Sequence, residues 1–186
     1  MNYHYLKPGI FELYTGPMRS GKTKAMLQKI EPIKYSNHKY RLIRPDVDDR
    51  KDRLYTNEYI YIRGYRPQEI LDISQNIDVI GIDELQFFDK SIVDVILDLQ
   101  KENKYIIGAG LDLNHKGKLF NGMGELMGIA NIVHKLTAIC EKEGCNNIAT
   151  RTQRLDANQK PITGNAPEIE VGDGQYRVYC LEHFIK

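Results

Sequence analysis

The chain has 186 residues, of which 26 are Lys or Arg and 25 are Asp or Glu, so its formal net charge is +1. With 41% hydrophobic and 27% charged residues its composition is globular, which excludes a disordered or collagen-like protein. A charge this close to zero argues against nucleic acid as the main partner, because proteins that bind duplexes carry a basic surplus.

The N-terminal segment and the number of cysteines both favour a cytoplasmic location. Residues 1–8 contain no apolar run of signal-peptide length, and nowhere do 18 apolar residues follow one another. Three cysteines are an odd number and too few for a secreted disulfide scaffold. We therefore expect a cytoplasmic protein with no membrane partner.

Short apolar strands alternate with helix-length segments over the first two-thirds of the chain, which predicts an α/β fold with a parallel sheet. The predicted strands are, in chain order, Ile10–Tyr14, Tyr40–Ile43, Val79–Ile82, Tyr105–Gly108 and Leu136–Ile139. The predicted helices are Lys22–Ile30, Pro67–Ser74, Lys90–Glu102 and Glu125–Ala130. The first helix should end before Pro32, because proline interrupts the hydrogen bonds of a helix interior.

The character of the sequence changes after about Lys135. All three cysteines follow this point, together with the short alternating runs Ile169–Val171 and Tyr176–Tyr179. A stretch rich in Pro, Gly and Asn, Asn158–Pro167, reads as a loop. We therefore predict a nucleotide-binding α/β domain at residues 1–135 and a small β-rich subdomain at residues 136–186.

The turn between the first predicted strand and helix matches the phosphate-loop pattern G-x-x-x-x-G-K-[ST] at every position. Its residues, the candidate ATP-binding set, are Gly16, Pro17, Met18, Arg19, Ser20, Gly21, Lys22 and Thr23. Backbone N–H groups of such a loop and of the helix behind it surround a phosphate. Lys22 would bridge the β- and γ-phosphates, and the Thr23 hydroxyl would bind Mg²⁺. Arg19 either adds charge near the phosphates or faces solvent.

Two carboxylates, Asp83 and Glu84, follow the third predicted strand. Ligands of parallel sheets bind at the carboxyl ends of the strands, so Asp83 is a candidate ATP-site residue that would hold Mg²⁺ together with Thr23. Glu84 is then available as a general base. An ATPase would use it to orient water and a kinase to accept a proton from a substrate hydroxyl, and both readings remain open from these residues.

Three cysteines and one histidine form two close pairs, Cys140 with Cys145 and Cys180 with His183. Three thiolates and one imidazole suit a tetrahedral Zn²⁺ site. Four protein ligands leave no open position, so this zinc would be structural.

The chain resembles the type II thymidine kinases, the zinc-containing P-loop deoxynucleoside kinases, over nearly its whole length. The motifs that carry the resemblance are GPMRSGKT (16–23), DDR (48–50), VIGIDELQFF (79–88), GLDLNHKGKLF (110–120), KLTAIC (135–140), TQR (152–154), VGDGQY (171–176) and CLEH (180–183). The resemblance implies a P-loop NTPase-like parallel sheet, with a zinc ribbon that carries a lasso-shaped loop, about Asp156–Tyr176.

The resemblance also implies the reaction, in which the γ-phosphate of ATP passes to the 5′-hydroxyl of thymidine in nucleoside salvage. By position, Glu84 is similar to the family's catalytic base, and Arg50 to a residue that stabilises the transferring group. The implied substrate-binding residues are Met18, Asp48, Phe87, Leu111, Phe120, Thr152, Val171, Gly172 and Tyr176. His115 stands where the family usually has Phe, which predicts a more polar pocket. The resemblance further implies a homotetramer.

Two other function classes compete with a kinase. One is a P-loop ATPase in which Glu84 activates water. The other is a zinc-ribbon module for nucleic acid, which predicts a basic ribbon. Residues 136–186 instead hold six basic and seven acidic residues, which counts against the second alternative.

Overall fold

The structure is a computed structural model that describes residues 7–47, 58–120, 122–163 and 175–185. Within this part of the chain, six strands pair in parallel into one sheet, in the spatial order β3-β2-β4-β5-β1-β6. The strands are β1 (Phe11–Gly16), β2 (Tyr40–Pro45), β3 (Tyr59–Ile62), β4 (Val79–Ile82), β5 (Tyr105–Leu111) and β6 (Ile132–Lys135). The predicted α/β class is confirmed.

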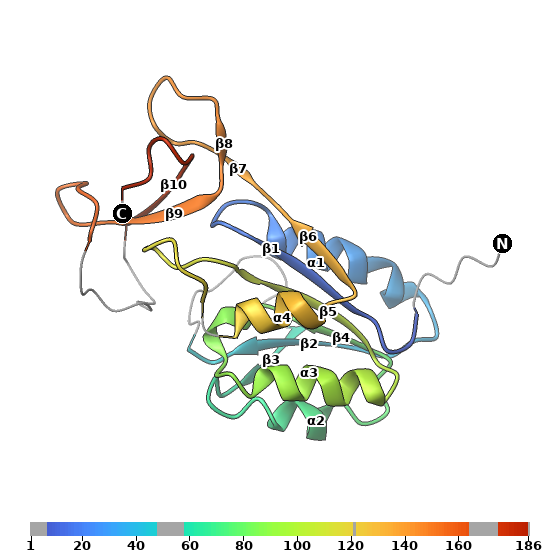
Figure 1. Cartoon of the computed structure of the whole chain (residues 1–186). Helices are drawn as coiled ribbons and strands as arrows, with labels where there is room; N and C mark the ends of the chain where they lie inside the picture. Colours follow the sequence, from blue (N-terminus) through green and yellow to red (C-terminus); the bar gives the residue numbers. More distant parts are fainter. Residues whose placement is uncertain (1–6, 48–57, 121, 164–174, 186) are drawn as a thin grey trace.

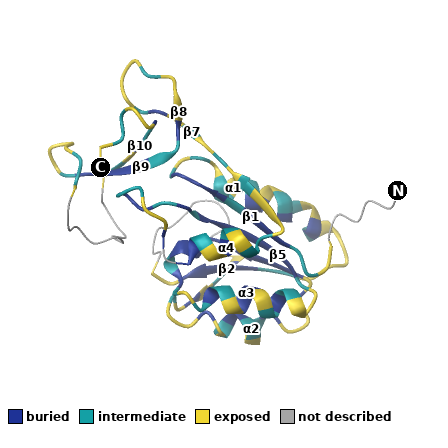
Figure 2. Ribbon diagram, viewed as in Figure 1, coloured by how far each residue is buried: buried dark blue, intermediate teal, exposed yellow. Residues whose placement is uncertain are grey.

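Helices cover both faces of this sheet (Figure 1). On one face lie α1 (Lys22–Ile30) and the 3₁₀ turn η1 (Glu31–Tyr35), and α1 ends before Pro32 as predicted. On the other face lie α2 (Glu69–Ile73), α3 (Ile92–Lys101) and α4 (Met123–Ile129). The inner strands β1, β2, β4 and β5 are mostly buried, whereas the edge strand β6 is mostly exposed (Figure 2).

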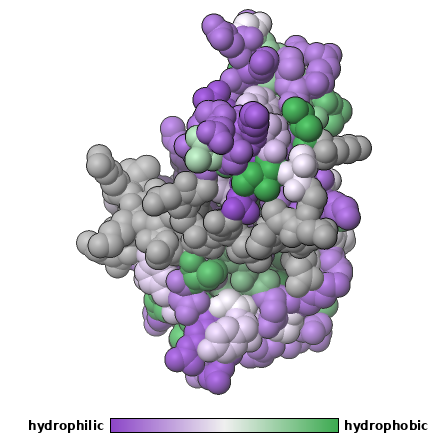
Figure 3. Space-filling view, turned by 90° about the vertical axis from the view of Figure 1, so that its left-hand side faces the viewer, coloured by the Kyte–Doolittle hydropathy of each residue, from purple (hydrophilic) through white to green (hydrophobic). Residues whose placement is uncertain are grey.

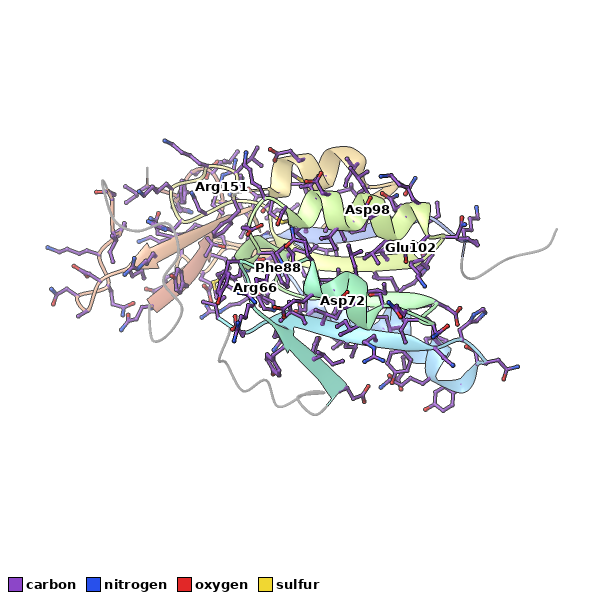
Figure 4. All side chains as sticks on the ribbon, turned by 90° about the horizontal axis from the view of Figure 1, so that it is seen from below. Arg66, Asp72, Phe88, Asp98, Glu102 and Arg151 are labelled. Atoms are coloured by element: carbon purple, nitrogen blue, oxygen red, sulfur yellow. The ribbon has the colours of Figure 1, made fainter. Side chains whose placement is uncertain are left out.

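Helix α3 shows how sequence spacing becomes packing. Its residues Ile92, Val95, Ile96 and Leu99 recur at helical spacing and are at most 2% exposed, so they form one apolar stripe against the sheet. Figure 4 labels Asp98 along this helix, where the carboxylate pairs with Lys101.

The two edge strands differ from the prediction. Strand β3, Tyr59–Ile62, was not predicted, because a strand of four residues at the sheet edge, with only its two end residues buried, gives too short a pattern. The predicted strand at Leu136–Ile139 was wrong as a strand of the main sheet. The edge strand β6 ends at Lys135, where the N–H of Leu136 donates to the carbonyl oxygen of Thr15 at 2.7 Å.

Beyond β6 the chain forms the ribbon, residues 138–163 and 175–185, which contains two small antiparallel sheets. One pairs β7 (Ala138–Ile139) with β8 (Ile148–Ala149), and the other pairs β9 (Arg151–Leu155) with β10 (Gln175–Tyr179). The ribbon lies at the end of the α/β unit where the phosphate loop follows β1 (Figure 1). Among the described residues, no helix is long and apolar enough to cross a bilayer.

Candidate active site

The phosphate loop connects β1 to α1, and glycines shape it. Gly16 has φ 141°, and a Cβ there would lie 2.2 Å from the carbonyl oxygen of Leu136, so no other residue fits this close approach. Gly21 precedes α1 in the left-handed conformation, with φ 83°. In the part of the chain that the structure describes, no side chain caps this helix and its first turn has no acid. The N-terminal N–H groups and the positive end of the dipole are therefore suited to an anion.

Helix α1 follows β1, and β1 is separated from β4 in the sheet by one strand, β5. The first residues of α1 nevertheless reach the end of β4. The Thr23 hydroxyl donates a hydrogen bond to Asp83 Oδ1 at 3.0 Å. The two candidate Mg²⁺ ligands, which are 60 residues apart in the chain, are thus brought together, and their oxygens are the ligand type that Mg²⁺ prefers.

Asp83 is buried among polar partners from the neighbouring strands. A guanidinium nitrogen of Arg44, on β2, lies 2.5 Å from Asp83 Oδ2, and the Tyr59 hydroxyl donates to the same oxygen at 3.3 Å. The Arg44 guanidinium also lies 4.4 Å from the centre of the Tyr59 ring. No local motif marks Arg44 or Tyr59 in the sequence; the arginine within the otherwise apolar end of β2 is the available signal.

The pKa of Asp83 is raised to about 6. Burial is the main cause, and the neighbouring charge of Glu84 adds to it. The charge and hydrogen bond of Arg44 and the hydrogen bond from Thr23 act in the opposite direction. A divalent cation beside Asp83 would favour its charged form.

Glu84 leaves the line of β4 because its backbone is left-handed, with φ 54° and ψ 42°. This conformation is uncommon for a residue with a Cβ and is enriched at functional sites. The side chain of Glu84 is half-buried, and its Oε2 accepts a hydrogen bond from Gln86 Nε2 at 2.5 Å. Gln86, like Arg44 and Tyr59, was not predicted as a site residue.

Two basic residues of the loop have protein partners. Lys22 Nζ donates to the carbonyl oxygen of Pro17 at 2.6 Å, so its ammonium lies over the loop. Arg19 forms an ion pair with Glu141 of the ribbon. The Arg19 side chain is thereby directed toward a carboxylate of the ribbon, and it stays 55% exposed.

The ribbon also contacts the loop at the residue before Arg19, Met18. The N–H of Met18 donates to Thr152 Oγ1, on β9, at 3.0 Å. The Met18 side chain packs against the small apolar cluster of the ribbon, which consists of Cys140, Ala149, Val178 and Cys180. Thr152, expected at the substrate, therefore also holds the phosphate loop.

The cysteines and the histidine come together as predicted. One ligand atom from each of Cys140, Cys145, Cys180 and His183 lies within 4.8 Å of the others. His183 Nδ1 is 3.6 Å from the sulfur of Cys140 and 3.2 Å from that of Cys180. Tetrahedral Zn²⁺ with ordinary bond lengths requires sulfur–nitrogen separations of about 3.5 Å. The four residues therefore fit a zinc ion.

The Cys140 thiol is suited to this role because its pKa is lowered. Burial acts against the lowering, but hydrogen bonds from the backbone at Cys180 and Lys142 and from the neighbouring thiols outweigh it. The thiolate is the form that binds metals.

Comparison with known proteins decides the family. The model of the thymidine kinase family matches residues 9–184, nearly the whole chain. The chain belongs to the thymidine kinase family. It is therefore an ATP-dependent phosphotransferase.

The expected nucleoside-binding residues of this thymidine kinase family member are only partly described. Phe87, Leu111 and Tyr176 are half-buried, whereas Phe120 is 7% exposed and packs in the core beside the helices. The neighbour of Phe87, Phe88, is a core residue at 2% exposure and is labelled in Figure 4. This difference agrees with a surface role for Phe87.

The remaining expected residues divide between buried and undescribed ones. His115 is 4% exposed. The residues that lie outside the described part of the chain are Asp48, Arg50, Val171 and Gly172. Viewed from the side of the ribbon, hydrophobic atoms show in the middle of the face, between hydrophilic residues above and below (Figure 3).

Proposed function

We propose that this enzyme transfers the γ-phosphate of ATP to the 5′-hydroxyl of thymidine, with Glu84 as the general base. One observation carries the proposal. The Thr23 hydroxyl donates a hydrogen bond to the Asp83 carboxylate at the carboxyl end of β4, and Glu84 is the next residue in the chain. This arrangement combines a metal-binding pair with a separate carboxylate for the proton. The family match supports the nucleoside as acceptor.

Thr23 and Asp83 would hold the Mg²⁺ that accompanies ATP. When bound, the cation neutralises charge on the β- and γ-phosphates. Backbone N–H groups of the loop after Met18 and of the first turn of α1 would surround the phosphates, and Lys22 would move from the Pro17 carbonyl to the bridging position. Arg50 would stabilise the transferring phosphoryl group.

Glu84 would accept the proton of the 5′-hydroxyl late in the reaction. A carboxylate cannot deprotonate an alcohol in advance, because the two pKa values differ by about ten units on reference values. In a loose phosphoryl-transfer transition state the proton needs to leave only as the new bond forms. The base must therefore be held close to the hydroxyl.

The base and sugar of thymidine would lie between the α/β unit and the ribbon. A flat pyrimidine suits aromatic and thioether surfaces. We assign this pocket to Met18, Asp48, Phe87, Leu111, Phe120, Thr152, Val171, Gly172 and Tyr176. His115 replaces the usual phenylalanine, so we propose a more polar boundary there.

We further propose a structural Zn²⁺ at Cys140, Cys145, Cys180 and His183, a cytoplasmic location and a homotetramer. The geometry of the four ligands supports the zinc. Family resemblance alone supports the tetramer. Light scattering should find four times the chain mass of 21.5 kDa.

The proposed reaction is tested with γ-labelled ATP, Mg²⁺ and each deoxynucleoside in turn. Labelled thymidine monophosphate is the expected product, and Lys22→Met should abolish it. Release of the label only as free phosphate would contradict the proposal and favour an ATPase.

A further inference from the structure

Gln86 joins the proposed base to the end of a neighbouring strand. It lies in the 3₁₀ turn η3 (Leu85–Phe87) directly after Glu84, and it is 1% exposed. Its Nε2 donates to Glu84 Oε2 at 2.5 Å, and its Oε1 accepts from the N–H of Leu111 at 2.9 Å. Both ends of this buried amide are thus used.

The backbone determines which way the amide points. The N–H of Leu111 can only donate, so its partner must be the amide oxygen. The NH₂ group consequently faces the carboxylate. The fit is close, because a Cβ at Gly110 would lie 3.0 Å from Gln86 Oε1 and 3.2 Å from Leu85 Cβ. Strand β5, which also belongs to the core, therefore fixes the direction of the donor.

A glutamate alone has several rotamers, and ordering a long side chain costs up to about 2 kcal/mol. A hydrogen bond to a charged acceptor is stronger than one between neutral groups. The left-handed backbone at Glu84 sets the direction in which the side chain leaves the turn. The Gln86 amide then holds the end of that side chain.

We propose that Gln86 is a positioning residue that holds the Glu84 carboxylate in the orientation required for proton acceptance. This inference rests on the proposed role of Glu84 as the base. Gln86 acts through Glu84, so its removal should lower the rate of phosphoryl transfer without weakening the binding of ATP.

Two substitutions separate positioning from support of the fold. Gln86→Met keeps the size of the side chain but removes both hydrogen bonds. Gln86→Glu keeps an acceptor for the N–H of Leu111 but replaces the donor to Glu84 by a like charge. A matched control is Gln100→Met, because Gln100 also makes two side-chain hydrogen bonds, to the oxygens of Gly9 and Asn131, but does so from the far end of α3.

The experiment measures kcat and the KM for ATP in a double-mutant cycle with Glu84→Gln. Misplacement of a reacting group costs on the order of 100-fold in rate, so kcat should fall about 10- to 100-fold in both Gln86 variants. The KM for ATP should change less than about threefold, and Gln100→Met should retain the wild-type kcat within about twofold, as expected for contacts distant from the reacting groups. In the Glu84→Gln background, Gln86→Met should lower kcat by less than about a further threefold, because the effects of coupled residues are not additive.

Three outcomes would overturn the inference. Wild-type turnover of Gln86→Met, with Glu84→Gln inactive, would contradict the role of Gln86 alone. A full multiplicative loss in the double variant would show that Gln86 acts independently of Glu84. Normal turnover of Glu84→Gln would contradict the base itself, and with it the inference.

Discussion

The phosphate site and the ribbon contact each other at Met18 and Arg19, but they are stabilised in different ways. The phosphate site, which consists of the loop after β1 and the residues that follow β4, lies at the carboxyl ends of the strands. The sheet there has extensive apolar layers on both faces. The ribbon has a cluster of four buried residues, and two of these are cysteines. So small a core buries little apolar surface, and a domain of this size usually needs a metal. We therefore expect the α/β unit to be stable through packing and the ribbon to depend on a metal held by Cys140, Cys145, Cys180 and His183.

The largest effect should follow from breaking the ribbon's ligand set with His183→Ala. Structural zinc contributes about 10–16 kcal/mol of apparent binding free energy in small domains. We therefore expect loss of the bound zinc and rapid proteolysis within residues 138–179, while the α/β unit stays resistant. Metal analysis and limited proteolysis measure both effects.

The matched control is His38→Ala, because the His38 side chain is 55% exposed and far from the cysteines in the sequence. It should keep about one zinc per chain, as four-ligand sites do when their ligands are intact. Retention of zinc and of protease resistance in His183→Ala would contradict the view that the ribbon, unlike the α/β unit, needs a metal for its stability.

Within the α/β unit, the substitution that lowers the free energy of unfolding most should be Arg44→Met. Arg44 and Asp83 form an ion pair in which both side chains are at most 2% exposed. Removal of one buried partner leaves an uncompensated charge and costs about 3–5 kcal/mol. Denaturant unfolding should show this loss, whereas the exposed Arg63→Met should change the free energy of unfolding by less than about 0.5 kcal/mol. Equal stability of the two variants would be inconsistent with a buried, structurally important pair.

A smaller effect is expected at Glu12, a 2%-exposed carboxylate on β1. It accepts hydrogen bonds from the hydroxyls of Tyr105 and Tyr14, the latter at 2.7 Å, and lies 2.8 Å from His134 Nε2. Burial raises its pKa, but these contacts and the charge of Lys29 outweigh burial, so the pKa is lowered overall. Glu12→Gln should cost about 1–3 kcal/mol, the range for disturbing buried hydrogen bonds.

The pH dependence of this effect has a definite sign. A carboxyl group with a lowered pKa in the folded state stabilises the protein above its unfolded pKa, and this contribution disappears as the pH falls through the folded value. The stability gap between wild type and Glu12→Gln should therefore be full at neutral pH and close below about pH 4, near the unfolded pKa of a glutamate. Unfolding curves from pH 7 to pH 3 measure it, with the exposed Glu102→Gln as control. A gap that widens at low pH would refute the lowered pKa.

The smallest effect should come from the ion pair between the two regions. The side chains of Arg19 and Glu141 are 55% and 31% exposed, and such surface pairs contribute about 0–1 kcal/mol. Arg19→Gln should accordingly leave the melting temperature nearly unchanged and raise the KM for ATP only slightly. A large loss of ATP binding would mean that Arg19 contacts the nucleotide directly.

Local patterns account for most of what the sequence could predict. The phosphate-loop pattern, α1, and the pair Asp83 and Glu84 are contiguous in the sequence, and the cluster of three cysteines and one histidine in the ribbon is identified by residue type and spacing. Arg44 and Gln86 were missed because their partners come from neighbouring strands and turns, which no local pattern reveals. Strand β6 was misplaced because Ile132 and Val133 are about 40% exposed at the sheet edge and are followed by His and Lys. Edge strands lack the clear apolar pattern of buried ones.

In the mechanism that we propose, Asp83 binds the metal and Glu84 takes the proton. The most direct test titrates Mg²⁺-ATP into Glu84→Gln and then follows phosphoryl transfer to thymidine in a single turnover. We predict a Kd for Mg²⁺-ATP close to that of the wild type and a transfer rate lower by about 10²- to 10⁴-fold, the usual contribution of a general base. Transfer at the wild-type rate would contradict the claim.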